Sequence, residues 1–488
     1  MMTAMKCTRR NFLRSSAAVA AAGIGGLNAP METLLADDAK PFQHPKQDRP
    51  NIVFFFSDQQ RWDTLGCYGQ KLPITPNLDR MAKEGVLFEN AFSVQPVCGP
   101  ARAVIQTGKY ATEIGCFRNG IPLPLNELSI ADRLSAAGYE VGYIGKWHLA
   151  SDKEHKFAAK PIPPERRGGY RDFWLASDVL EFTSHGYDGH MFDADMKQVD
   201  FKGYRADCVT DFALDYLRTR DRKRPFFLFV SYIEPHFQND HKHFEGPNGS
   251  KEKYKDFDVP GDLVGTEGDW REEYPDYLGC CNSLDYNLGR LRDELVKLGL
   301  DKNTLVFYTS DHGCHFRTRN AEYKRSCHES SIRVPMLAYG PGFTGGKVVK
   351  ELVSLIDVAP TIIAAGGVTT PSSMRGRPLQ ELVEGKAKDW PEDVFVQISE
   401  SGTGRAVRTD RWKYCVWVTK EDAGGLPGAD VYHESHLYDL KADPFELNNL
   451  VRDPKHASVR AKLRALLLRR MTEVGEKKPR ILPAPEAT

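Results

Sequence analysis

The stretch Asn51–Ser57, which reads NIVFFFS, constrains the fold of this chain more than any other feature of its sequence. Its apolar residues, from Ile52 to Phe56, are continuous, so a strand formed here has to be covered on both faces. Strands of this kind belong to parallel sheets that lie between two layers of helices. The sequence therefore predicts an α/β domain with this strand in its interior.

Further apolar runs continue the same pattern along the chain. A helix is expected to begin at Thr75-Pro76, and apolar and charged residues alternate at helical spacing from Asp285 to Leu298. Further strands are predicted at Tyr139–Ile144, Phe226–Tyr232, Thr304–Ser310 and Pro335–Tyr339. Strands that alternate with helices favour a central, mostly parallel sheet between helices, and we assign residues 37–390 to this large α/β domain.

The pattern changes near residue 390, where short strand-like segments are separated by Gly and Asp turns. They are followed by one helical segment, from about Ala457 to Val474. The predicted strands are Val394–Ser399, Gly404–Arg408, Trp412–Val418 and His436–Leu440. Residues 391–488 are therefore expected to form a smaller α+β subdomain, with an antiparallel sheet covered by one helix.

The first 36 residues have the features of a targeting segment. Arg9-Arg10 precedes a small-residue apolar run from Ala17 to Leu27, a pattern that resembles a bacterial twin-arginine export signal. We therefore expect cleavage near Ala36, passage through the export machinery and a periplasmic or secreted location. No other apolar run approaches the roughly 20 residues that span a bilayer, so no membrane span is predicted.

Charge and cysteine spacing give no sign of two other classes of protein, nucleic-acid binders and disulfide-rich domains. The 66 basic and 66 acidic residues cancel, which argues against a general nucleic-acid binder. The ten cysteines show no disulfide framework in their spacing, and we assign no disulfide pair from the sequence.

Polar side chains follow two of the predicted strands at the point where each strand ends. Asp58-Gln59 follows the first strand, and Asp311-His312 follows the strand at 304–310. Open α/β sheets bind their ligands at this edge. Two carboxylates, an amide oxygen and an imidazole suit one divalent cation, although an Asp after a strand is more often a turn or cap residue.

The segment Cys98-Gly99-Pro100-Ala101-Arg102 gives these strand ends a chemical context. It carries the pattern C-x-P-x-R, and Ile105 and Thr107-Gly108 continue it. This segment is similar to the signature of formylglycine-dependent sulfatases, a branch of the alkaline phosphatase superfamily. Other segments resemble that family in the family's own order: Thr75–Asp79, Gly145–Leu149, Glu234–His236, Lys324 with Glu329–Pro335, and Leu437–Leu440.

The resemblance implies a role for each matching residue. Cys98 would be converted to formylglycine, whose hydrated aldehyde supplies the nucleophilic oxygen, by a formylglycine-generating maturation enzyme. Asp58, Gln59, Asp311 and His312, with an oxygen of modified Cys98, would bind one metal ion, for which we expect Ca²⁺. Arg102 would orient the aldehyde hydrate, and Lys146 and Lys324 would bind sulfate oxygens. His148 would accept a proton from the hydrate, and His236 would protonate the leaving alcohol.

The expected reaction is hydrolysis of sulfate esters, with a sulfated carbohydrate as substrate and degradation of an external polysaccharide as the setting. His315, Arg317, Arg319, Asn320 and Arg405 are candidate substrate contacts, and for each a surface salt bridge is an equal alternative. Two other functions remain open at this point. One is a phosphonate monoester or phosphodiester hydrolase of the same superfamily, and the other is a catalytically inactive protein that binds sulfated glycans.

Overall fold

Strand β1 (Asn51–Ser57) lies inside the main sheet, as its apolar sequence predicts. The computed structural model describes residues 49–419 and 423–486. All seven residues of β1 are buried. The strand pairs in parallel with β7 (Phe226–Ser231) on one side and with β8 (Thr304–Ser310) on the other.

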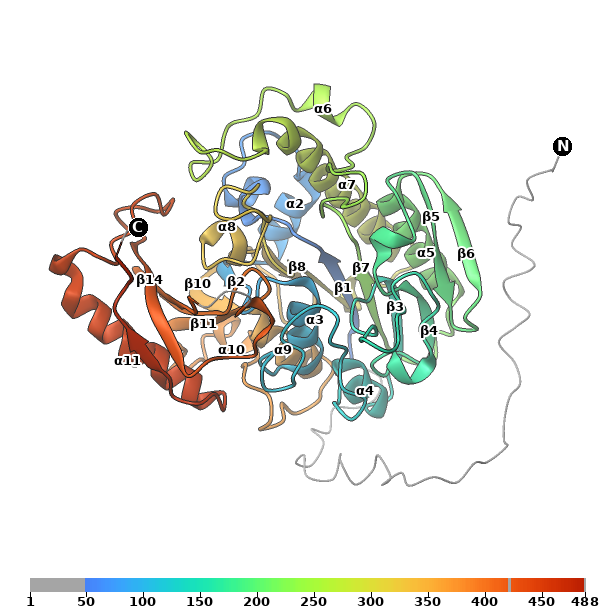
Figure 1. Cartoon of the computed structure of the whole chain (residues 1–488). Coiled ribbons are helices and arrows are strands. Elements are labelled where there is room, and N and C mark those ends of the chain that lie inside the picture. The colour runs from blue at the N-terminus through green and yellow to red at the C-terminus, as the bar shows by residue number, and fades with distance from the viewer. Residues whose placement is uncertain (1–48, 420–422, 487–488) are drawn as a thin grey trace. The chain divides into compact units, whose positions relative to one another are not determined.

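The main sheet contains ten strands in the order β10-β2-β9-β8-β1-β7-β3-β4-β5-β6 (Figure 1). Its five central strands, from β8 to β4, are all parallel, which confirms the predicted α/β class. Antiparallel strands occur toward both edges. The remaining strands are β2 (Val86–Phe92), β3 (Glu140–Lys146), β4 (Phe173–Ser177), β5 (Asp188–Asp193), β6 (Gln198–Lys202), β9 (Met336–Tyr339) and β10 (Lys347–Ser354).

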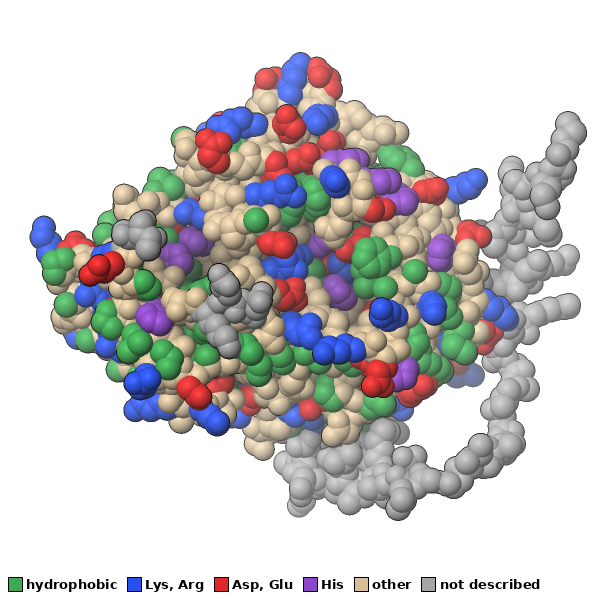
Figure 2. Space-filling model, in the orientation of Figure 1, with side chains coloured by type: hydrophobic (Ala, Val, Ile, Leu, Met, Phe, Trp, Pro, Cys, Tyr) green, Lys and Arg blue, Asp and Glu red, His purple; other side chains and the backbone are tan. Residues whose placement is uncertain are grey.

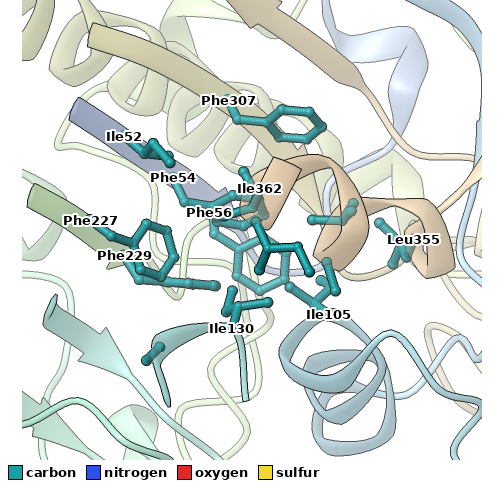
Figure 3. Packing of buried hydrophobic residues seen from close by; sticks show 14 of the residues in the cluster. Ile52, Phe54, Phe56, Ile105, Ile130, Phe227, Phe229, Phe307, Leu355 and Ile362 are labelled. Atoms are coloured by element: carbon teal, nitrogen blue, oxygen red, sulfur yellow. The ribbon is translucent and has the colours of Figure 1, made fainter. Parts of the chain in front are cut away.

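Helices cover both faces of this sheet because β1 directs apolar side chains to each. Ile52, Phe54 and Phe56 pack into one hydrophobic cluster, together with α3 (Cys98–Thr107), α4 (Ile130–Ala136) and α9 (Val358–Ala365) (Figure 3). Val53 and Phe55 belong to a second cluster. The helices of that second face are α2 (Pro76–Glu84), α5 (Arg205–Thr219) and α7 (Trp270–Lys297).

The residues after 390 form a separate sheet of five strands in the order β11-β12-β13-β14-β15. Helix α11 (Ala457–Glu473) packs on one face of it, as predicted. The other face shares a hydrophobic cluster with β2 and α3 of the main body. The strands are β11 (Asp393–Ile398), β12 (Gly404–Thr409), β13 (Trp412–Trp417), β14 (Val431–Asp439) and β15 (Arg480–Leu482).

Some features differ from the sequence expectations. The helix predicted from residue 285 extends from Trp270, and the short strand β15, which pairs in parallel with β14, was not predicted. The short helices are α6 (Ser250–Lys253), α8 (Glu329–Ile332) and α10 (Gln380–Val383). No helix among the described residues is long and apolar enough to cross a membrane. The predicted export signal lies outside the described residues.

Candidate active site

The predicted metal ligands meet at the carboxyl ends of β1 and β8. These neighbouring strands are parallel and pair Ser57 with Ser310, so the residues that follow them emerge at the same edge. The backbone N–H of Gln59 donates to Asp311 Oδ1 at 2.9 Å. The sheet itself therefore brings together two pairs of residues that are about 250 positions apart in the chain.

Cys98 lies beside these strand ends, at the first position of α3. Its Sγ is 3.4 Å from Asp58 Oδ1, 3.3 Å from His312 Nε2 and 2.9 Å from Lys324 Nζ. The side chain is only 2% exposed. Burial alone would raise the pKa of this thiol, but Lys324, Lys146 and His312 hold the pKa well below its usual range. The position is therefore built to hold a negatively charged group.

The donor set fits a divalent cation. Ligand atoms of Asp58, Cys98, Asp311 and His312 all lie within 4.8 Å of one another, and all four residues are buried. Burial and the Asp58 charge raise the pKa of Asp311 to about 7, and Asp311 Oδ2 has no hydrogen-bond partner among the described residues. A cation would pair with this carboxylate and relieve its repulsion from Asp58.

Two basic side chains surround Asp58. Arg102, one turn into α3, donates from NH2 to Asp58 Oδ2 at 2.9 Å, and Lys146 Nζ lies 2.8 Å from the same oxygen. Burial and Cys98 raise the pKa of Asp58, but Lys146, His236 and Arg102 together bring it below its usual range. Asp58 is therefore held as a carboxylate. On the face shown in Figure 2, basic, acidic and histidine side chains gather near the middle.

The two predicted proton-transfer histidines also lie at this site. His236 Nδ1 is 2.6 Å from the Phe237 carbonyl oxygen and donates to it, so Nε2 is free to accept the hydrogen bond from Lys324 Nζ at 2.9 Å. Burial, Lys324 and Lys146 lower the pKa of His236, which is consistent with this neutral tautomer. His148 has φ of 57°, its side chain helps to lower the pKa of the Cys98 thiol, and its Nδ1 has no hydrogen-bond partner among the described residues.

Sequence reasoning missed Glu181, which lies in the turn after β4. Its Oε2 is 3.2 Å from Lys146 Nζ, and its Oε1 accepts from Asn239 Nδ2 at 2.9 Å. Although burial raises the pKa of Glu181, Lys146 and the two site histidines lower it to about 2. No local motif marks this residue, because an acidic side chain between Leu180 and Phe182 is unremarkable in sequence.

Asn119 was also missed. Its Oδ1 accepts from the backbone N–H of Gly99 at 2.9 Å, directly beside Cys98, and its own backbone N–H donates to Glu400 Oε1 at 2.6 Å. It thus connects the first turn of α3 to the loop after β11. Only the folded chain brings these three segments together.

The five predicted substrate contacts all have protein partners. His315 Nε2 and Asn320 Nδ2 both donate to the Lys324 carbonyl oxygen, at 3.1 and 3.0 Å. Arg317 pairs with Asp269, and Arg319 donates to the carbonyl oxygens of residues 445 and 446. These four hold the loop around Lys324.

Arg405, the fifth candidate substrate contact, is neither at a substrate surface nor in a surface salt bridge. It is 1% exposed, Nε lies 2.8 Å from Glu476, and both terminal nitrogens donate to backbone carbonyl oxygens. Its guanidinium is thus buried and held by protein partners at all three nitrogens. For the other four residues, contact with substrate stays a prediction.

The sequence matches models of known protein families and the sequences of known proteins. The sequence model of the Sulfatase family matches residues 50–368, and that of the N-sulphoglucosamine sulphohydrolase C-terminal region matches residues 321–473. An ulvan-active sulfatase of Formosa agariphila is 32% identical over 456 residues, which cover 89% of this chain and 83% of that protein.

Two solved structures show the same fold. The yidJ protein of Bacteroides fragilis aligns with a TM-score of 0.77 and 27% identity, covering 89% of this chain and 98% of that one. A structure in complex with its substrate D-glucosamine-2-N,6-O-disulfate aligns with a TM-score of 0.72 and 25% identity, covering 88% and 99% of the two chains.

Proposed function

This chain belongs to the sulfatase family and is a sulfuric ester hydrolase, and from that premise we propose that it removes sulfate from a sulfated carbohydrate by means of residue 98 and one bound cation. The observation that carries the proposal is the position of Cys98. Its Sγ lies at the first turn of α3, 2.9 Å from Lys324 Nζ and within hydrogen-bond reach of Asp58 and His312. A nucleophile, a cation site and positive charge for an anionic ester thus meet in one place.

Residue 98 and the cation would supply the chemistry that ordinary side chains lack. Converted to formylglycine, residue 98 supplies a hydrated aldehyde as the nucleophile, and a divalent cation supplies a Lewis acid at the sulfate. Asp58, Gln59, Asp311 and His312 would hold this cation. Three oxygen donors favour Ca²⁺, and the imidazole is the one donor that does not.

Three cationic side chains would bind and orient the ester. Arg102 is fixed by Asp58 and by Ser231 Oγ, to which its Nη1 donates at 2.7 Å, and it would orient a group at residue 98. Lys324 and Lys146 would neutralise sulfate oxygens in an enclosed site, where such pairing is stronger than in water.

Proton transfer would fall to the two histidines. Lys324 already donates to His236 Nε2, so an anionic substrate that draws Lys324 toward its oxygens would leave Nε2 able to carry a proton to the leaving oxygen. His148, whose side chain helps to lower the pKa of the Cys98 thiol, would accept a proton from the nucleophile.

The substrate class rests on the relatives. One relative is named for its action on ulvan, and the substrate in one aligned structure is a disulfated glucosamine. We extend this class to the present chain as a sulfated saccharide. We further propose export through the twin-arginine route to the periplasm or beyond, after a maturation enzyme has modified Cys98.

Mass spectrometry of the peptide that contains residue 98, combined with a panel of defined sulfated saccharides, tests the proposal. We expect formylglycine at residue 98 and desulfation of at least one saccharide, with Cys98→Ala inactive on all. An active preparation that contains only unmodified cysteine would refute the nucleophile. Faster turnover of aryl phosphonate than of aryl sulfate would favour the phosphonate hydrolase instead.

A further inference from the structure

A second group of metal-ligating side chains lies apart from the candidate active site, between the Lys324 loop and the C-terminal sheet. It consists of Cys327, Cys415 and His436, which the roles given above do not use. Cys327 lies three residues after Lys324 and just before α8. Cys415 and His436 lie on the neighbouring strands β13 and β14.

The C-terminal sheet is irregular where these residues meet. Cys415 is paired with His436, and the next pair is Val416 with Glu434, so β14 contains one extra residue at this point. Such a bulge changes the direction of a side chain and is common beside functional sites. Cys415 and Cys327 also belong to the same buried cluster between the two sheets, which places Cys415 on the face toward the main body.

The spacing of the donor atoms suits one shared cation. One ligand atom from each of the three residues lies within 4.8 Å of the other two. Ligand atoms that share a tetrahedral Zn²⁺ are about 3.5–3.8 Å apart, given Zn–S near 2.3 Å and Zn–N near 2.0 Å. Both cysteines are free thiols in the structure, so the pair is not a disulfide.

One polar atom of the cluster also lacks a protein partner. Thiolate and neutral imidazole are the forms that bind metal. His436 Nδ1 is enclosed and has no hydrogen-bond partner among the described residues.

We propose that Cys327, Cys415 and His436 bind one Zn²⁺ ion, with a water molecule in the fourth position. Two thiolates and an imidazole form a softer donor set than the oxygens of the active site, so the two sites select different metals. The ion would join the segment after Lys324 to β13 and β14, and thereby fix the position of that lysine. This site does not depend on the sulfatase reaction, and its test does not measure that reaction.

The test uses the full chain with Cys98→Ala, because Cys98 is the thiol of the other candidate metal cluster. Protein stripped of metal by chelation is given Zn²⁺, dialysed and assayed for metal content, and a parallel sample with Co²⁺ is examined for thiolate-to-cobalt charge-transfer absorption. Cys415→Ser and the half-buried His436→Gln remove one ligand each, so a folding defect in one leaves the other informative. Cys116→Ser, a buried thiol that hydrogen bonds to Ile121, is the matched control.

We expect the parent and the Cys116→Ser control to retain one equivalent of Zn²⁺ more than Cys415→Ser or His436→Gln. With Co²⁺, only the parent and the control should show the thiolate-to-cobalt absorption band. Added Zn²⁺ should raise the melting temperature of the parent but not of the ligand variants. Equal zinc content in all four proteins, or a parent chain lighter by two hydrogens because Cys327 and Cys415 have formed a disulfide, would overturn the proposal.

Discussion

Replacing His236 with alanine should slow the hydrolysis of sugar sulfates far more than that of activated aryl sulfates. A sugar alkoxide leaves only with a proton, whereas a nitrophenolate leaves without one. A general acid contributes about a hundred- to ten-thousandfold, or roughly 3–5 kcal/mol of transition-state stabilisation. We therefore expect His236→Ala to lower kcat/KM by that range for a sugar sulfate and by less than about tenfold for nitrophenyl sulfate.

Lys324→Met should behave differently because Lys324 acts on the sulfate group itself. A charge about 4 Å from an anionic oxygen contributes about 4 kcal/mol at an effective dielectric constant of 20, which corresponds to about a thousandfold in rate. This loss should be similar for both substrates. Since Lys324 Nζ and His236 Nε2 are 2.9 Å apart, the double variant should lose less than the sum of the two single losses.

Steady-state kinetics on matched sugar and aryl sulfates, with the four proteins of this cycle, checks the reasoning. His243→Ala is a suitable control, because His243 Nδ1 also hydrogen bonds to the next carbonyl, at 2.9 Å, but is not among the residues around Cys98. It should retain activity on both substrates. Equal losses on both substrates for His236→Ala would show that the proton donor is another residue.

The remaining predictions concern metal, pH and stability. Chelation should abolish turnover, and Ca²⁺ should restore more activity than Mg²⁺, because Mg²⁺ retains bound waters for which this site has little room. Recovery of activity with Mg²⁺ but not with Ca²⁺ would contradict the ligand set. Burial lowers the pKa of His315 to about 4, although the hydrogen bond from its Nε2 to the Lys324 carbonyl oxygen opposes this shift, and a proton on Nδ1 would have no partner among the described residues. Neutral His315 therefore favours the folded state at a pH above its unfolded pKa near 6.5, and about 3 kcal/mol of the free energy of unfolding is lost as the pH falls to 4. Urea unfolding at several pH values should show a smaller loss for His315→Gln. The same pH dependence in the variant and the parent would refute this prediction. Arg205→Met should lower the free energy of unfolding by about 3–5 kcal/mol, because it leaves Glu234 buried and unpaired. In denaturant unfolding, the double variant with Glu234→Gln should recover part of this loss. No recovery would show that the loss comes from packing instead.

The sequence predicted those parts of the fold whose local pattern has one structural solution. The run at Ile52–Phe56 fitted a strand buried on both faces, and the strand-like run at Thr304–Ser310 was predicted as well; both are strands in the structure. Because both strands are parallel, Asp58 and Asp311 had to emerge at one edge, and the structure places them there. The direction of β9 was harder to predict, since nothing in a short apolar strand records which way it runs.

The residues that sequence reasoning missed depend on contacts between distant segments. Glu181 reaches Lys146 only because β4 lies beside β3 in the sheet. The sequence pattern places a subdomain boundary near residue 390, between Cys327 and Cys415. The bulge in β14 lies where His436 joins these two cysteines in one group. Spacing along the chain carries no signal for such pairs.

The burial of Cys98 also has a consequence for when the proposed modification of this residue would take place. Every residue of α3 is buried, and Cys98 is 2% exposed behind Lys324 and the ends of two sheet strands. Under the conversion proposed above, a maturation enzyme would have to surround the cysteine with its own catalytic groups, for which the finished fold leaves no room. The proposed oxidation would therefore belong to the newly made, still extended chain, and a molecule that folded first would stay inactive on later exposure to the same enzyme.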